Sequence, residues 1–277
     1  MDNPVFKVLL FALGPAAAMA LGGAVAAFRA PGPRLNSYFQ HFAAGVVFAA
    51  VATEVLPDVL HERAPVAAII GFACGTALML FIRWLTTKKL AGENANSEGG
   101  KAKSPWSMIA TIGVDVFIDG LLIGIGFAAN AQTGLLLTIA LGMEVLFLGL
   151  STAAEMNEAG WSRGKLIATI GGLALLLPVG GTLGASLLGG LQGAGLEVAL
   201  SFGAAALLYL VTEELLVEAH EVPETTLSTA MFFLGFLVLL IIDMLSRPAS
   251  GGTALRRLPL RGEVAMVQTM VALRRET

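Results

Sequence analysis

Eight long apolar stretches constrain this chain more than any other feature. Each is about 20 residues or longer, and a helix of that length rises far enough to cross the ~30 Å hydrocarbon core of a bilayer. A transmembrane β-barrel would instead show short segments of alternating hydrophobicity. We therefore predict an all-α polytopic membrane protein. The expected spanning helices cover residues 5–28, 38–60, 66–85, 106–129, 134–154, 166–189, 196–216 and 226–245.

The composition agrees with a membrane protein and excludes several other classes. Hydrophobic residues make up 56% of the chain and charged residues only 13%, whereas about 25% of a soluble domain is charged. The net charge of −3 comes with no basic stripe of the kind that nucleic-acid binding needs. The single cysteine, Cys74, excludes an internal disulfide and any cysteine-based metal motif.

We expect residues 1–246 to form one eight-helix transmembrane domain, followed by a flexible tail over residues 247–277. Residues 86–105 are polar and contain glycine, which predicts a disordered linker between the third and fourth spans. A proline at position 178, followed by Gly180 and Gly181, is expected to break helix 166–189.

The distribution of Lys and Arg in short loops predicts how the protein is oriented in the membrane. The loops after the first, third, fifth and seventh spans carry nine such residues, against Lys7 and Arg63 in the short segments of the other side. The six Arg after residue 246 argue for the opposite orientation, but the rule applies to short loops. We therefore predict that both termini lie outside the cell (inner) membrane and that the linker 86–105 is cytoplasmic.

Three carboxylates lie deep inside two consecutive spans. Asp115 and Asp119 are four residues apart in helix 106–129, so both face one side of that helix. Glu144 lies near the middle of helix 134–154, and the connection over residues 130–133 is too short to separate the two helices. An ionised Asp at membrane depth costs at least ~2.5 kcal/mol unless it is paired, hydrated or bound to a cation. This pattern favours a cation site, to which Met143 could add a weak thioether ligand; carboxyl groups that are protonated or hydrogen-bonded to other helices are the alternative.

The ends of helices 38–60 and 196–216 resemble each other. Residues 53–62 (TEVLPDVLHE) and 212–221 (TEELLVEAHE) share five of ten positions at an offset of 159. Because the second and seventh spans cross in opposite directions, this similarity is typical of an inverted-topology repeat; chance similarity is the alternative. A real repeat would place carboxylates and imidazoles along two approaches to the central site. The residues expected there are Glu54, His61, Glu213, Glu214, Glu218 and His220.

These segments resemble the Zrt/Irt-like (ZIP) family of divalent metal transporters. Residues 115–124 (DVFIDGLLIG) are similar to the family's fourth-helix motif, His-Asn-x-x-Asp/Glu-Gly-x-x-x-Gly, residues 42–58 to its second helix and residues 209–220 to its seventh. The resemblance implies eight helices arranged 3+2+3, with an inverted repeat of the first three and last three. It also implies a permease rather than an enzyme, which imports Zn²⁺, Fe²⁺, Mn²⁺ or Cd²⁺ as substrate without a cofactor, usually as a homodimer. Sliding of one helix bundle against another is the implied mechanism.

The chain departs from the family pattern at several ligand positions. Asp115 stands where the family has His, and Val116 where it often has Asn. In the fifth helix only Glu144 matches a family ligand, since Met143 and Phe147 occupy the other positions. Helix 166–189 contains no acidic residue. We therefore expect one oxygen-rich site rather than two metals, with less preference for Zn²⁺ relative to Mn²⁺ or Fe²⁺.

The leading hypothesis is a divalent-metal permease with Asp115, Asp119 and Glu144 as its central site. A transporter of protons or another solute would use the same carboxylates without a metal. A non-transporting membrane protein predicts that Asp119→Asn is neutral or stabilising. An intramembrane hydrolase is disfavoured because an aspartyl dyad normally comes from two separate segments, and no His-Glu-x-x-His or Gly-x-Ser-x-Gly motif is present.

Overall fold

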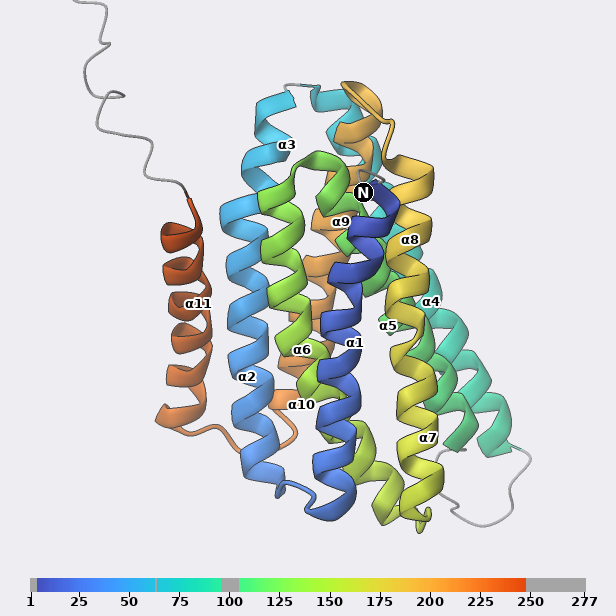
Figure 1. Cartoon of the computed structure of the whole chain (residues 1–277). Coiled ribbons are helices and arrows are strands. Elements are labelled where there is room, and N and C mark those ends of the chain that lie inside the picture. The colour runs from blue at the N-terminus through green and yellow to red at the C-terminus, as the bar shows by residue number, and fades with distance from the viewer. Residues whose placement is uncertain (1–3, 63, 96–104, 248–277) are drawn as a thin grey trace, which may run out of the picture. The chain divides into compact units, whose positions relative to one another are not determined.

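The computed structural model of the protein describes residues 4–62, 64–95 and 105–247. These residues are largely helical and contain no β-strand. Eight of their helical stretches are long and apolar enough to cross a bilayer, which confirms the predicted all-α polytopic membrane fold (Figure 1). The elements are α1 (Pro4–Phe28), α2 (Pro33–Ala50), π-helix η1 (Val51–Val55), α3 (Leu56–Glu62), α4 (Pro65–Ala95), α5 (Pro105–Ala129), α6 (Ala131–Glu158), α7 (Arg163–Ala174), α8 (Leu176–Leu188), α9 (Ala194–Tyr209), π-helix η2 (Leu210–Leu215), α10 (Leu216–Ala219) and α11 (Thr226–Ser246).

Local sequence signals begin and end several helices. α1, α2, α4 and α5 each begin at a proline, whose missing N–H costs nothing at the first helical position. α6 begins after Asn130, whose side chain accepts a hydrogen bond from the backbone N–H of Thr133 at 2.8 Å. Gly160 and Gly193 adopt positive φ angles of 79° and 54° in the connections after α6 and before α9.

The predicted third span, 66–85, agrees with the apolar stretch Pro65–Leu85, but the helix that contains it does not end there. α4 continues to Ala95, because Lys88, Lys89, Leu90 and Ala91 are good helix formers and contain no glycine or proline among them. The expected linker therefore loses its first ten residues to a helix. The rest of that linker, residues 96–104, and the expected tail from residue 248 lie outside the described residues.

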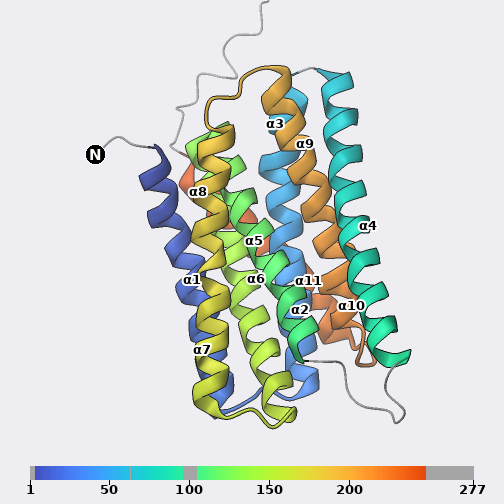
Figure 2. The same ribbon diagram turned by 90° about the vertical axis from the view of Figure 1, so that its right-hand side faces the viewer.

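The predicted break in the sixth span is confirmed. α7 ends at Ala174, one turn before Pro178, and α8 begins at Leu176, two residues before it. Proline has no N–H to bond the carbonyl four residues earlier, so the helical ladder is interrupted at Ala174. The two helices still follow one another along a single span (Figure 2), with only Leu175 between them.

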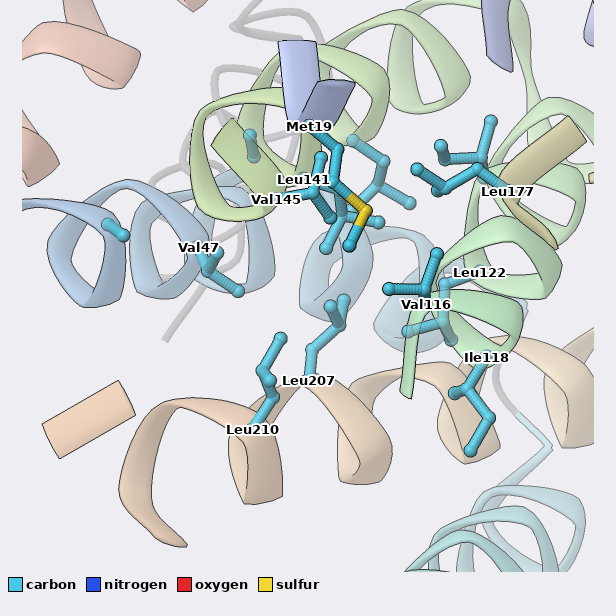
Figure 3. Packing of buried hydrophobic residues seen from close by; sticks show 14 of the residues in the cluster. Met19, Val47, Val116, Ile118, Leu122, Leu141, Val145, Leu177, Leu207 and Leu210 are labelled. Atoms are coloured by element: carbon cyan, nitrogen blue, oxygen red, sulfur yellow. The ribbon is translucent and has the colours of Figure 1, made fainter. Parts of the chain in front are cut away.

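Small residues let the helices approach closely. A side chain at Gly120 or Gly124 of α5 would collide with the backbone of α8 at Leu177 or Gly181. This close contact is the packing expected where helices cannot rely on a difference in hydrophobicity from the surrounding lipid. Between these contacts lies a core of larger side chains that includes Met19, Leu122 and Leu207, all nearly inaccessible to solvent (Figure 3).

Two features support the inverted repeat of the first three and last three spans. The π-helices η1 and η2 begin at Val51 and Leu210, the same offset of 159 that aligns the repeated sequence. Each lies near the C-terminal end of its span, and these ends, α3 and α10, are at opposite ends of the bundle (Figure 1).

The contacts between spans repeat as well. Gly75 of α4 packs on the backbone of Phe202 in α9, and Gly235 of α11 packs on the backbone of Phe42 in α2. An inverted repeat that exchanges the second span with the seventh, and the third with the eighth, converts one of these contacts into the other.

The chain divides into two units at Asp243. Only residues 243–247 of the second unit are described. They form the last turn of α11 and its end, where Arg247 Nε donates to Asp243 Oδ1 at 2.8 Å.

Candidate metal site

The central site is built from two antiparallel neighbours, α5 and α6, which are joined only by Asn130. Asp115 and Asp119 are one helical turn apart on α5 and face Glu144 on α6. One carboxylate oxygen from each of the three residues lies within 4.8 Å of the others. Two oxygens on opposite sides of one ion, each at ~2.2 Å, would be ~4.4 Å apart. The three carboxylates are therefore close enough to hold one divalent cation after a small adjustment.

The carboxylates have few other partners. Asp119 and Glu144 are each only 1% exposed. Among the described residues, Asp119 Oδ2 and both carboxylate oxygens of Glu144 have no hydrogen-bond partner. A buried acceptor without a donor costs about 1–3 kcal/mol, and more when it is charged. These oxygens need protons or a cation to be stable where they are.

No basic side chain is available in the middle of the described spans to neutralise this site. Lys and Arg occur in those spans only near their ends, at Lys7, Arg34, Arg83, Arg163 and Lys165. A site of three acidic groups without a nearby basic partner has the charge and the ligand type that hard and borderline divalent cations prefer.

Glu214 extends the site toward the end of the bundle where α10 lies. It comes from η2 and is placed beside Asp115, with Glu218 of α10 the next acidic group along the same span. Gln40 of α2 donates to Glu218 through Nε2 at 2.5 Å. Asp115 and Glu214 are partly exposed and Glu218 is exposed, so access to the central site increases in this direction.

Glu213, the immediate neighbour of Glu214, does not join this group. It is exposed and forms an ion pair with Arg83 of α4. Sequence position alone did not distinguish these two glutamates, which the sequence analysis placed on the same approach. In the structure their side chains lie on different sides of the same span.

The opposite approach is organised around Glu54, which lies in η1 and is 6% exposed. Thr133 Oγ1, at the start of α6, lies 3.4 Å from Glu54 Oε2 and donates to Asp58 Oδ2 at 2.8 Å. Asn130 Nδ2 donates to the same Asp58 oxygen at 2.9 Å. Asp58 was not among the predicted site residues, and its partners could not be read from the sequence because α3 and α6 are more than 70 residues apart.

The remaining predicted residues are Met143, His61 and His220. Met143 is half-buried and packs against the hydrophobic core. His61 is exposed at the end of α3. His220 belongs to a second group with His41 and Glu224, neither of which was predicted as a ligand.

The fold and this site define a polytopic α-helical membrane protein with an acidic centre between two antiparallel spans. The chain belongs to the ZIP zinc transporter family, whose model matches residues 88–243. A curated protein described as zinc transporter GufA, from Myxococcus xanthus, is 29% identical over 149 residues, which cover 53% of this chain and 58% of that relative. The chain therefore spans less than two thirds of the length of that relative. The predicted family is confirmed.

Proposed function

We propose that this chain carries divalent metal ions across a membrane, and that Asp115, Asp119 and Glu144 hold the ion midway. The observation that carries the proposal is the convergence of three carboxylates at the middle of two spans, where Asp119 Oδ2 and both oxygens of Glu144 accept no hydrogen bond from the described residues. Membership of the ZIP zinc transporter family supports the same conclusion. Glu214 is the fourth carboxylate of the proposed path, because it lies beside Asp115.

The donor set favours ions that accept oxygen ligands. Carboxylates alone suit Mn²⁺ and Fe²⁺, while Zn²⁺ and Cd²⁺ bind more tightly where imidazole or thiolate is added. The relative's description as a zinc transporter supports Zn²⁺ as a substrate. We propose that the permease accepts several of these ions and that its preference for Zn²⁺ is weak.

The polar groups on either side of the centre supply two approaches. Glu54 and Asp58 lie toward one end, and Glu218 and the His220 group toward the other. Import toward the cytoplasm, an inner-membrane location with both termini outside, and a homodimer stay predictions of the sequence analysis.

The test is uptake of Mn²⁺, Fe²⁺, Zn²⁺ and Cd²⁺ into proteoliposomes that contain the purified protein. We expect wild type to carry at least one ion, and Glu144→Gln and Asp119→Ala to carry none. Glu158→Gln is the matched control, because it removes an exposed carboxylate from the end of the same helix as Glu144 and is expected to leave uptake unchanged.

Two other results would contradict the proposal. Movement of protons without any metal, followed with a pH-sensitive dye, would favour the proton-transporter alternative. No transport at all, together with Asp119→Asn that is as stable as wild type or more stable, would favour a non-transporting membrane protein, since that change removes a buried charge.

A further inference from the structure

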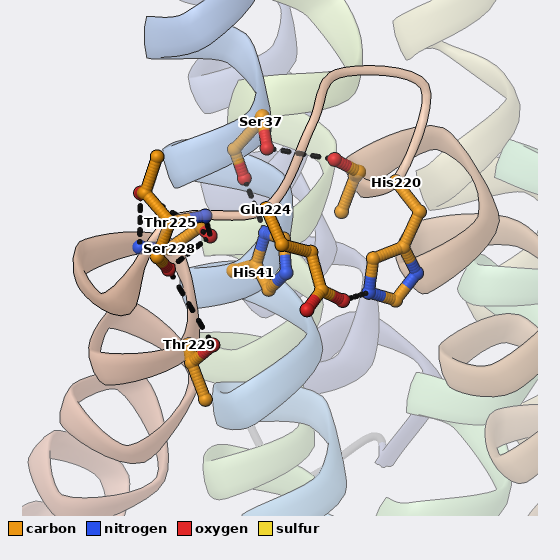
Figure 4. A network of polar contacts seen from close by, with 8 residues as sticks. Ser37, His41, His220, Glu224, Thr225, Ser228 and Thr229 are labelled. Carbon is orange, nitrogen blue, oxygen red and sulfur yellow. Dashed lines mark hydrogen bonds and ion pairs between the residues drawn. The ribbon is translucent and has the colours of Figure 1, made fainter.

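A second group of metal-binding side chains lies at the end of the bundle near α10. His41 of α2, His220 at the end of α10 and Glu224 in the connection to α11 each place one ligand atom within 4.8 Å of the others (Figure 4). The two imidazole rings meet edge to face, with centroids 5.2 Å apart. Unlike the central site, this group combines two nitrogen ligands with one carboxylate.

His41 is oriented so that one ring nitrogen can serve as a metal ligand. Its side chain is 3% exposed, and its Nδ1 lies 2.8 Å from the carbonyl oxygen of Ser37. A carbonyl oxygen can only accept, so Nδ1 carries the proton and Nε2 keeps its lone pair in the neutral ring. A backbone carbonyl on the second nitrogen is the usual way in which proteins orient a histidine ligand.

His220 and Glu224 supply the accessible half of the group. His220 Nε2 and Glu224 Oε1 are 2.5 Å apart, and their side chains are 44% and 58% exposed. A tetrahedral ion between them would separate the two atoms to about 3.4 Å, given ligand distances of ~2.0–2.2 Å. Because both side chains reach solvent, this adjustment requires no repacking of the core.

The segment that carries these two residues is fixed at both ends. Ser37 Oγ donates to the carbonyl of Ala219 at 2.7 Å, directly before His220. After Glu224, the backbone N–H of Thr225 donates to Ser228 Oγ at 2.9 Å and the N–H of Ser228 donates to Thr225 Oγ1 at 3.1 Å. The ligands are therefore presented by a connection that is already ordered, which lowers the entropic cost of binding an ion.

We propose that His41, His220 and Glu224 form a second metal site, distinct from the central carboxylates, that takes a borderline divalent cation such as Zn²⁺. Two imidazoles and one carboxylate are a known ligand set for Zn²⁺ with an open fourth position. The site does not depend on the proposed transport function. Gln40, the neighbour of His41, donates a hydrogen bond to Glu218, so the second site also lies next to the acidic groups that lead to Asp115. That the second site is the final binding site of the transport path rests on the proposed function.

The experiment is equilibrium binding of Zn²⁺ to the purified full-length protein in detergent. The central site is first removed by Asp119→Asn with Glu144→Gln, and this background is expected to retain one bound Zn²⁺. Adding Glu224→Gln or His41→Gln is expected to weaken that binding by at least ~10-fold, because even residues behind the ligands of metal sites contribute 10–100-fold. X-ray absorption at the zinc edge is expected to show imidazole scattering in the background variant and a reduced signal after His41→Gln.

Glu221→Gln is the matched control, because Glu221 is exposed in the same connection and lies outside the group. Glu224→Gln changes only an exposed side chain, so it tests the site even if the buried His41→Gln fails to fold, which size-exclusion chromatography would reveal. The proposal is overturned if the background variant binds no Zn²⁺, or if Glu224→Gln and Glu221→Gln bind it equally well. If the protein transports no metal but still binds Zn²⁺ at this site, the proposed function is contradicted and the second metal site is supported.

Discussion

The two π-helices are the same backbone feature used in two different ways. η1 and η2 both contain the repeated Thr-Glu pair and are placed at the same point of the inverted repeat. In η1, Glu54 is buried and lies beside Thr133, while the next residue, Val55, is part of the core. In η2, Glu213 is exposed against Arg83, and the next residue, Glu214, turns toward Asp115.

The difference comes from one position. Val55 and Glu214 are equivalent under the offset of 159, so the η2 half alone directs a carboxylate at the centre. A π-turn inserts one residue into the helical ladder and changes which face the following residues occupy. The two repeated halves therefore form an asymmetric site. From the end near α10 it is approached past Glu218 and Glu214, and from the end near α3 past Glu54 and its partners.

The largest expected effect tests whether the two halves are structurally equivalent. Leucine in place of Gly75 or Gly235 would meet the facing backbone at Phe202 or Phe42, and overpacking of this kind costs about 3 kcal/mol. Because the repeat relates the two contacts, both variants are expected to lose folded protein to a similar extent after heating in detergent, measured by size-exclusion chromatography.

Gly172→Leu is the control for these variants, since an added Cβ there meets nothing within 4 Å and the protein is expected to stay folded. If one of Gly75→Leu and Gly235→Leu behaves like this control while the other unfolds, the structural equivalence of the two halves is broken.

The next effect tests whether the halves differ in chemistry. Glu214→Gln is expected to lower the initial rate of metal uptake by about 10–100-fold, because it removes the carboxylate beside Asp115. Glu54→Gln is expected to lower it by less than about tenfold, because Glu54 lies outside the central group. Equal losses in proteoliposome uptake would show that both halves contribute to binding in the same way.

Access to the two ends should differ as well. In a Cys74→Ser background, Glu218→Cys is expected to react with a membrane-impermeant thiol reagent at least ~10-fold faster than Glu54→Cys, because Glu218 is exposed and Glu54 is buried. A local opening that costs ~1.4 kcal/mol is enough for a tenfold difference. Equal labelling rates, measured by mass shift over time, would mean that the end at Glu54 is as open as the end at Glu218.

The smallest effect is expected at the ion pair that separates Glu213 from Glu214. Arg83→Gln should change metal uptake by less than about twofold, since exposed ion pairs contribute little. Initial uptake rates over a range of metal concentrations provide the measurement. A loss as large as that of Glu214→Gln would place Glu213 in the path with its neighbour.

Much of the fold follows from local sequence. Apolar stretches of bilayer length specified the eight spans, prolines marked several helix starts, and Pro178 interrupted the sixth span as expected. The central cluster was also accessible to this reasoning, because Asp115 and Asp119 are one turn apart on a single helix, and the short connection expected over residues 130–133 forces the next span to run back beside it. The end of α4 was missed because a polar composition was taken for a linker, although most of its residues are good helix formers.

Other parts of the site depend on contacts between segments that are far apart in the chain. The sequence treated Glu213 and Glu214 alike, and only the tertiary structure showed that Glu213 pairs with Arg83 whereas Glu214 lies beside Asp115. His41 and Glu224 meet through the packing of α2 against the start of the last span, 183 positions along the chain, which no local spacing encodes. Periodicity and short connections act within a helix or between neighbours, so the sequence alone determined the spans and the carboxylate pair. The register and rotation of distant helices are decided by side-chain packing throughout the bundle, so only the tertiary structure decided which acidic residue faces the centre.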